Sequence, residues 1–407
     1  MTEQPRLKRS LGLPQMVLYG LGTTIGAGIY ALIGELAGIS GYMAPAAFLL
    51  ALMMAGVSAL SFAELSSRYP QAAGASLYIQ QSFGSKKLAL LVGLLVALAG
   101  IVSSAALVNA FTGYLSQFIA LERFTVILII TLSIGVLAAW GIAESVFIAA
   151  LITLIEIGGL LFVIYHSAPV FLQLPERFNE FIPGFELNNW HVIYSGALLA
   201  FYAFIGFEDM VDVAEEIKDV RTTLPFAIII TLFITTALYM AIMMAAVLAI
   251  PPAQLAQEKA PLVSLYQYFS HDDSALIGVI GMVAIINGAL IQSIMASRVL
   301  YGLSFRGHLH QSLSRVHHFT RTPVIATFIV TTAIFSFALW GQLSALAEIT
   351  SIIMLLIFSL VNLSLWRIKQ REASLPEGVF SVPRWSPLIG FLVSAGFVLS
   401  QLFNTLW

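Results

Sequence analysis

Two apolar stretches of the sequence contain the residues best suited to bind a small charged ligand. Residues 20–30 read GLGTTIGAGIY and residues 201–209 read FYAFIGFED, so both combine glycine with polar groups. Glycine is costly in a helix interior, which makes the glycines of the first stretch unusual for an uninterrupted helix. If the backbone unwinds at these places, its unpaired N–H and C=O groups become available to charged groups of a ligand.

Three interpretations of residues 20–30 compete. The Gly22-xxx-Gly26 spacing is typical of two helices that pack closely. The glycines also resemble a dinucleotide fingerprint, but no strand precedes them, which excludes that function. The third interpretation is an interruption of the helix around a polar site. Residues 201–209 favour the interruption, because they hold the corresponding place in a second set of five spans, and interrupted helices at matching positions of inverted halves indicate a transporter site.

Such a pair of interruptions predicts a site for a zwitterion. An interruption near Thr23–Ile25 would expose N–H groups at a half-helix start, where the positive dipole end favours a carboxylate. The interruption in 201–209 would free carbonyls that accept hydrogen bonds from an ammonium group. The predicted binding residues are Thr23, Thr24, Gly26, Ala27, Gly28, Tyr202, Ala203, Phe204 and Ile205.

The aromatic rings of the second stretch could close over this ligand. We expect one or two of Phe201, Tyr202, Phe204 and Phe207 to act as gates, with Tyr202 favoured, although packing against neighbouring helices is the alternative for most of them. Glu208 is a candidate for the inner gate, and a structural ion pair, for example with Arg298, is the alternative.

Composition places these stretches in a membrane. Apolar residues make up 59% of the 407 positions and charged residues 10%, against about 25% charged in soluble domains. Apolar runs long enough to cross about 30 Å of hydrocarbon as helices recur along the chain, and they lack the alternation of a barrel strand. The predicted fold is an all-α membrane protein with about eleven transmembrane helices. These lie near 14–37, 44–66, 88–117, 124–140, 144–166, 191–213, 223–250, 274–301, 323–340, 345–366 and 387–406.

The distribution of basic residues predicts the orientation. With a cytoplasmic N-terminus, only Arg123, Arg177 and Lys259 of the 19 lysines and arginines fall outside, in agreement with the positive-inside rule. All six tryptophans lie at or beside a predicted helix end, where the membrane meets water. The first span is too long for a cleavable signal peptide. We therefore expect a multi-pass protein of the cell (plasma or inner) membrane.

Several functions are not expected. The chain has no cysteine, which excludes disulfides and thiolate metal sites. No motif with a nucleophile and base lies at membrane depth, so we do not expect an enzyme. Four histidines at 308–318 lie in a basic loop without a carboxylate, and we expect no metal site there. No cofactor or nucleic acid partner is expected; the partners are the lipid bilayer and a small-molecule substrate.

Several motifs resemble those of the amino acid–polyamine–organocation (APC) superfamily. The stretch AELSSRYP at 63–70 resembles the junction of the second and third helices of that family. EEIK at 215–218 resembles the loop between its sixth and seventh helices, and SRVLYG at 297–302 resembles the segment after its eighth helix. Within that superfamily, GIAES at 141–145 and residues 201–216 look most like cationic amino acid transporters and their bacterial relatives.

The resemblance spans about residues 10–370 and implies a five-plus-five inverted repeat that binds amino acids at interrupted first and sixth helices. The repeats would cover 1–170 and 185–370, with an additional helix at 385–407. The family usually has twelve helices, so this chain departs from it by ending after the eleventh.

The fifth span departs from the family in a second way. Proton-coupled members carry a lysine there in place of a sodium ion, whereas this chain has Glu156 at about that position. A mid-membrane acid costs roughly 2.5–3.5 kcal/mol on insertion scales, which indicates a purpose. We hypothesise that Glu156 binds a coupling H⁺ or Na⁺ near the first span, with Gly22, Ile25 and Ser293 as further candidates; the alternative is a protonated acid hydrogen-bonded to a neighbouring helix.

Further polar residues of the spans are expected at helix ends or in the core. Glu64 is expected to pair near the cytoplasmic end of the second span. Polar residues of the third and eighth spans could face the core, namely Ser103, Ser104, Asn109, Asn287, Gln292 and Ser293.

The leading prediction is a secondary transporter of amino acids that works by alternating access, coupled to protons or cations or acting as an exchanger. A polyamine or amine transporter is the rival within this class, and a non-transporting amino acid sensor is the rival outside it. The sequence leaves the particular substrate and the oligomeric state open.

Overall fold

The helices of the chain are long, apolar and joined by short connections. The computed structural model describes residue 9 and residues 11–71, 74–140, 146–270, 274–372 and 378–406. The long helices are α1 (Leu13–Ser40), α2 (Ala44–Arg68), α4 (Lys86–Leu115), α5 (Arg123–Trp140), α6 (Val146–Ser167), α8 (Leu187–Tyr202), α9 (Val220–Ala249), α12 (Ala275–Phe305), α13 (Val324–Trp340), α14 (Leu343–Arg371) and α15 (Ser386–Leu406). The short ones are η1 (Gly41–Met43), α3 (Gly74–Phe83), η3 (Ala168–Gln173), α7 (Leu174–Arg177), η4 (Phe178–Phe181), η5 (Phe207–Glu216), α10 (Pro252–Leu255), α11 (Pro261–Phe269) and η6 (Gln311–Ser314).

The all-helical membrane fold agrees with the sequence prediction. Within the described residues, nine segments are long and apolar enough to cross a membrane, and the only strand-like feature is an isolated bridge between Leu11 and Ile217. One of these segments, Gly28–Arg68, joins the end of α1 to α2, and α13 is a shorter apolar helix. Helices satisfy all backbone groups internally, which lipid cannot do. The exact number of eleven spans stays a prediction.

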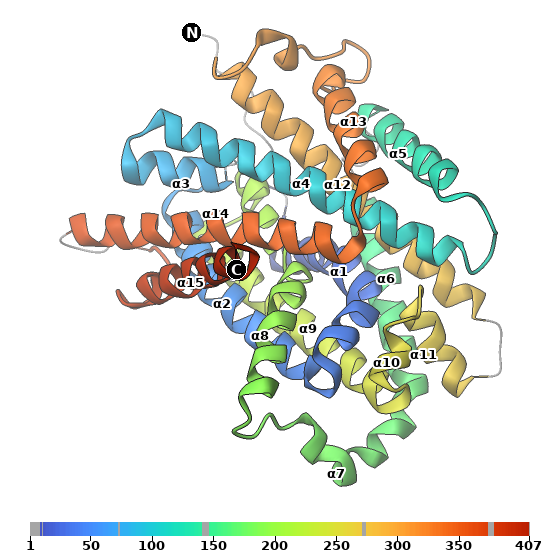
Figure 1. Cartoon of the computed structure of the whole chain (residues 1–407). Coiled ribbons are helices and arrows are strands. Elements are labelled where there is room, and N and C mark those ends of the chain that lie inside the picture. The colour runs from blue at the N-terminus through green and yellow to red at the C-terminus, as the bar shows by residue number, and fades with distance from the viewer. Residues whose placement is uncertain are drawn as a thin grey trace.

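The helix α1 lies at the centre of the bundle. It contacts α9, α6, α12 and α8, while α4 packs along α12 and α2 along α9. Figure 1 shows α5 and α13 side by side at one margin, while α14 runs from another margin to the middle of the view beside α15. The bridge ties the chain just before α1 to the end of η5, because Leu11 N donates to Glu216 O and Lys218 N donates to Leu11 O. The start of α1 and the end of the sixth span therefore lie at the same face.

The sixth span loses its α-helical form within the stretch where the sequence predicted an interruption. The helix α8 ends at Tyr202, and the 3₁₀ helix η5 begins at Phe207. Between them, residues 203–206 form a turn in which Ala203 N, for example, donates to the carbonyl three residues earlier. Gly206 has a φ of 124°, a backbone conformation that favours glycine over every other residue.

The interruption predicted in the first span was wrong. The helix α1 runs through Thr23–Ile25 as a single helix from Leu13 to Ser40. Its glycines instead allow close packing: a Cβ atom at Gly22 would lie 2.1 Å from Thr153 Oγ1, and one at Gly28 would lie 2.3 Å from Ala203 Cα. The competing interpretation, close approach between helices through small residues, therefore explains these glycines.

The threonines of this stretch are also satisfied within the helix. Thr23 Oγ1 donates to the carbonyl of Gly20 at 3.0 Å, and Thr24 Oγ1 donates to the same carbonyl at 2.7 Å. Such bonds to the preceding turn let a hydroxyl remain inside a continuous helix.

Candidate functional site

The centre of the bundle brings α1 against the turn at residues 203–206. Gly28 lies against Ala203, and a Cβ atom at Gly206 would lie 2.3 Å from the carbonyl oxygen of Thr23. Thr23 Oγ1 also lies 2.9 Å from the carbonyl oxygen of Gly206, so that its one proton is shared between this carbonyl and that of Gly20. The structure thus joins the two stretches that the sequence singled out, although 183 positions separate Thr23 from Gly206.

A tyrosine that the sequence interpretation missed completes this junction. Tyr239, in the middle of α9, has its hydroxyl 2.9 Å from the carbonyl oxygen of Thr24 and 3.0 Å from that of Ala203. The only signal in the sequence is a hydroxyl group in an apolar run, which many lipid-facing or packed tyrosines share. We call Thr24, Ala203, Gly206 and Tyr239, together with Thr23, the central junction.

The backbone N–H groups that were predicted to bind a carboxylate are not freed by an interruption of the helix. Gly26, Ala27 and Gly28 lie inside the continuous helix α1, where the i→i−4 pattern uses backbone N–H groups. The structure describes the backbone of Gly26 and Ala27 as helical but does not describe what packs around these two residues. The α-helix ends at the turn, as the acceptor half of the predicted site requires, whereas the donor half needs an interruption that α1 does not have.

The aromatic side chains around the turn face different neighbours. Phe204 packs between Phe48 and Tyr239, with ring centroids 6.3 and 5.6 Å apart. Phe201 and Phe207 both contact the ring of Phe358 on α14. For Phe201 and Phe207, the structure shows the expected alternative of packing against other helices.

Tyr202 differs from these rings because its hydroxyl links two helices. It is buried and lies 2.9 Å from Ser103 Oγ on α4. Ser104, the next residue of α4, donates instead to the carbonyl of Ala289 on α12 at 3.0 Å. The third span therefore does present polar groups to the core, one of them at the end of α8.

Glu156 lies on α6 between α1 and α12. Its side chain is fully buried, and Asn287 on α12 donates to its Oε1 at 3.2 Å. Its Oε2 has no hydrogen-bond partner within the described part of the chain. Tyr30 on α1 donates to the backbone carbonyl of Glu156 at 2.8 Å.

The other coupling candidates are also buried, and among the described residues no hydrogen bond joins them to the side chain of Glu156. Gly22 faces Thr153, one turn before Glu156 on α6. Ile25 is fully buried. Ser293 on α12 is also fully buried, and its hydroxyl has no hydrogen-bond partner among the described residues.

Two hollows lie on opposite sides of the central junction. A cavity of about 60 Å³ is lined by Glu208, Asp209 and Asp212 of η5, on the side where η5 leads to the bridge with Leu11. A larger hollow of about 620 Å³ is lined by Ala31, Gly34 and Glu35 of α1, which lie beyond the junction along that helix.

The carboxylates of η5 have partners of different kinds. Glu208 Oε2 accepts a hydrogen bond from Gly206 N at 2.9 Å and so stabilises the turn itself. Asp209 is buried and accepts from Gln292 Nε2 at 3.4 Å. The expected alternative for Glu208, a structural role, thus has a backbone amide as the partner.

Comparison with known proteins identifies the family to which this arrangement belongs. Residues 11–406 match the family model described as amino acid permease. The chain belongs to the amino acid permease family. It is therefore a multi-pass membrane transporter of amino acids, as the resemblance of its motifs to the APC superfamily implied.

Individual relatives of the permease include transporters of different amino acids. The branched-chain amino acid permease of Bacillus subtilis is 27% identical over 98% of this chain and 89% of its own length. The vacuolar cationic amino acid transporter 2 of Arabidopsis thaliana is 28% identical over 88% of this chain and 59% of its own. The cationic amino acid transporter 4 of Mus musculus is 26% identical over 91% and 61%. The permease thus spans about three fifths of these two cationic relatives.

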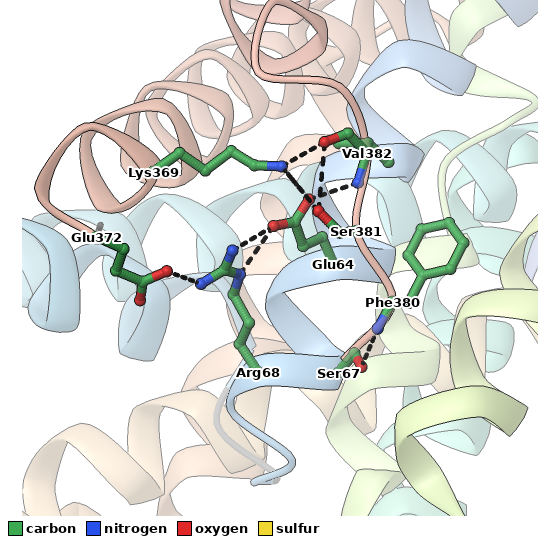
Figure 2. Close-up of polar contacts among 8 residues, drawn as sticks. All are labelled: Glu64, Ser67, Arg68, Lys369, Glu372, Phe380, Ser381 and Val382. Atoms are coloured by element: carbon green, nitrogen blue, oxygen red, sulfur yellow. Dashed lines mark hydrogen bonds and ion pairs between the residues drawn. The ribbon is translucent and has the colours of Figure 1, made fainter. Parts of the chain in front are cut away.

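A buried cluster of charges joins the ends of α2 and α14 in the permease (Figure 2). Glu64 is completely buried, and its Oε1 accepts hydrogen bonds from Arg68 Nε and Nη2 at 2.8 and 2.6 Å. Its Oε2 accepts from Lys369 Nζ at 2.6 Å and from the backbone N–H of Val382 at 2.7 Å. Arg68 also pairs with Glu372. Glu64, Arg68, Lys369 and Glu372 form what we call the four-charge cluster.

The cluster holds residues 381 and 382, in the segment between α14 and α15, against the end of α2. Figure 2 shows Val382 and Phe380 of this segment lying against α2. Ser67 Oγ accepts from Phe380 N at 3.0 Å and donates to the carbonyl of Arg221, in the first turn of α9, at 2.8 Å. The pairing predicted for Glu64 at the end of the second span is present, and its partners connect α2 with α14, α9 and this segment.

Proposed function

We propose that the permease is a secondary active carrier that moves amino acids by alternating access through the central junction. The observation that carries this proposal is the pair of backbone carbonyls, of Thr24 and Ala203, that meet there from two different spans. The two hollows on opposite sides of the junction support it, because a carrier needs one route to each face of the membrane.

The ammonium group of the substrate would bind at the turn between α8 and η5. The carbonyl oxygens of Ala203, Phe204 and Ile205 follow the last α-helical turn, and the negative end of the helix dipole favours a cation there. Tyr202 and Phe204 would border the ligand, with Tyr202 as the gate. The carboxylate-binding part of the site has no support in the geometry of α1.

The moving part would consist of α1, α2, α8 with η5, and α9, and the scaffold of α4, α5, α6, α12, α13 and α14. The moving part thus takes the first two spans of each of the two repeats expected at 1–170 and 185–370. The extensive packing of α2 against α9 and of α4 against α12 supports this division, because each pair falls within one part.

The general function is tested by ligand-induced stabilisation of the purified protein. A ligand that binds only the folded state raises the unfolding midpoint, by an amount that grows with the ratio of its concentration to its dissociation constant. The standard amino acids should include at least one that raises it, whereas agmatine and putrescine should not. Stabilisation by the amines alone would favour the polyamine transporter. Binding of an amino acid without flux in proteoliposomes would favour the sensor.

Coupling is proposed to occur through a proton on Glu156. A buried carboxylate with an oxygen that lacks a partner is unfavourable when charged, whereas a protonated carboxyl is neutral and gains an O–H donor. Glu156 lies on α6 and is hydrogen-bonded to residues of α1 and α12, so its protonation would be linked to movement of α1 against the scaffold.

Replacing Glu156 with glutamine should make uptake insensitive to pH, because the amide keeps the shape of the protonated acid and cannot release a proton. Initial uptake rates in proteoliposomes at two pH values, each with and without sodium, measure this. Glu180→Gln serves as the control, since Glu180 is a partly exposed acid of η4 that pairs with Arg177 and lines neither hollow. If Glu156→Gln keeps the pH response, the sodium response and the rate of the unchanged protein, Glu156 has no role in coupling.

The N-terminus is proposed to lie in the cytoplasm of a cell whose plasma or inner membrane holds the carrier. The absence of cysteine makes this directly testable with single cysteines. Lys218 and Lys259 are both exposed and lie in loops on opposite sides of the predicted topology. In intact cells, an impermeant maleimide should label Lys259→Cys and should label Lys218→Cys only after the membrane is opened. The reverse pattern would invert the proposed orientation.

A further inference from the structure

The side chain of Tyr239 is held firmly at the central junction. It is fully buried, and its ring lies between Phe48 and Phe204, with centroids 5.6 Å from each. The hydroxyl thereby reaches α1 and the turn after α8 at once, so that α9 contacts both stretches that contain the candidate ammonium acceptors.

The hydrogen-bonding capacity of this hydroxyl does not match its surroundings. A phenol has one proton to donate, yet the oxygen of Tyr239 lies within 3.0 Å of the carbonyl oxygens of both Thr24 and Ala203. One proton cannot give both carbonyls a full hydrogen bond. An ammonium group carries three donor protons and bears a positive charge, so it satisfies two carbonyls and still has a proton for a third.

We infer that the Tyr239 hydroxyl occupies the ammonium position in the substrate-free carrier and that the substrate's ammonium group displaces it. This inference rests on the proposed function. Displacement releases α9 from α1 and from the turn in the same event, so that the occupied and empty carriers differ in how these three elements are joined. A ligand without an ammonium group lacks the donors to replace the hydroxyl.

Tyr239→Phe removes the hydroxyl and keeps the ring between its two aromatic neighbours. The substrate-free protein should unfold at a lower temperature, since the buried carbonyls of Thr24 and Ala203 lose the one hydroxyl proton that they share. The amino acid that stabilises the unchanged protein should bind roughly tenfold more tightly to the variant, the factor that corresponds to one hydrogen bond no longer displaced. Unfolding midpoints across a concentration series of that amino acid give both quantities. The amino acid without its α-amino group should stabilise neither protein.

Tyr114→Phe is the matched control. Tyr114 is also buried, and its hydroxyl donates to the carbonyl of Tyr30 on α1 at 2.8 Å, but it does not reach the turn at 203–206. This variant should lower the unfolding midpoint without changing the affinity. Equal or weaker affinity in Tyr239→Phe, or the same response in both variants, overturns the inference and leaves the proposed function in place. If no amino acid stabilises the unchanged protein, the proposed function fails first.

A second measurement covers the case in which Tyr239→Phe does not fold. Incorporation of 3-fluorotyrosine at position 239 keeps the hydroxyl and provides a ¹⁹F resonance that reports its surroundings. Addition of the amino acid should shift this resonance, whereas the same acid without its amino group should leave it unchanged. A resonance that ignores both ligands contradicts displacement.

Discussion

Glu64→Gln should destabilise the permease by about 3–5 kcal/mol, because it leaves buried Lys369 without an anion and leaves Arg68 only the more exposed Glu372. Arg68 and Lys369 have side chains that are only 3% and 4% exposed, so water cannot replace the lost carboxylate. The amide oxygen of glutamine can still accept one hydrogen bond, but it cannot neutralise both charges. The unfolding midpoint in detergent, together with the yield of folded protein, measures this effect.

Two comparisons separate charge from packing in this prediction. Glu180→Gln breaks the ion pair with Arg177, whose partners are 24% and 38% exposed, and should cost at most about 1 kcal/mol. Combining Glu64→Gln with Lys369→Met removes opposite charges together and should recover part of the stability. A Glu64→Gln protein as stable as the Glu180→Gln protein would show that the four-charge cluster contributes little.

Gly206→Ala should abolish uptake and destabilise the protein by about 3 kcal/mol or more, because two independent costs fall on one methyl group. At a φ of 124° an alanine is strained, whatever the space around it. Its Cβ would also lie 2.3 Å from the carbonyl oxygen of Thr23, a backbone atom that cannot rotate away. Either the turn or α1 must move, which disrupts the central junction.

Gly56→Ala on α2 provides the control for this second prediction. Gly56 is helical, and a Cβ atom there meets nothing within 4 Å. Alanine is favoured over glycine in a helix by about 1 kcal/mol, so this variant should be as stable as the unchanged protein or slightly more so. Uptake and unfolding midpoints of the two variants, measured side by side, test the assignment. Normal uptake by Gly206→Ala would show that the close contact with Thr23 is dispensable.

Both predictions concern contacts between residues that are far apart in the chain. Glu64 pairs with Lys369 across 305 positions, and Thr23 meets Gly206 across 183. Sequence patterns report on neighbours within one helix, which explains why a partner for Glu64 could be expected although Lys369 could not be identified as one. For the same reason Tyr239 gave no usable signal, since its importance lies only in the two carbonyls that it reaches.

The sequence alone determined the membrane-spanning helical fold, because in lipid each apolar run must satisfy its backbone groups internally and a helix does so. It also located the stretches at 20–30 and 201–209, since glycine is kept inside a helix only for a backbone reason. Whether that reason is an interruption or close packing was decided by the tertiary structure. Gly206 adopts a backbone conformation that other residues avoid, whereas Gly22 and Gly28 provide room for Thr153 and Ala203. These two uses of glycine look the same in a sequence, because each requires only the absence of a side chain.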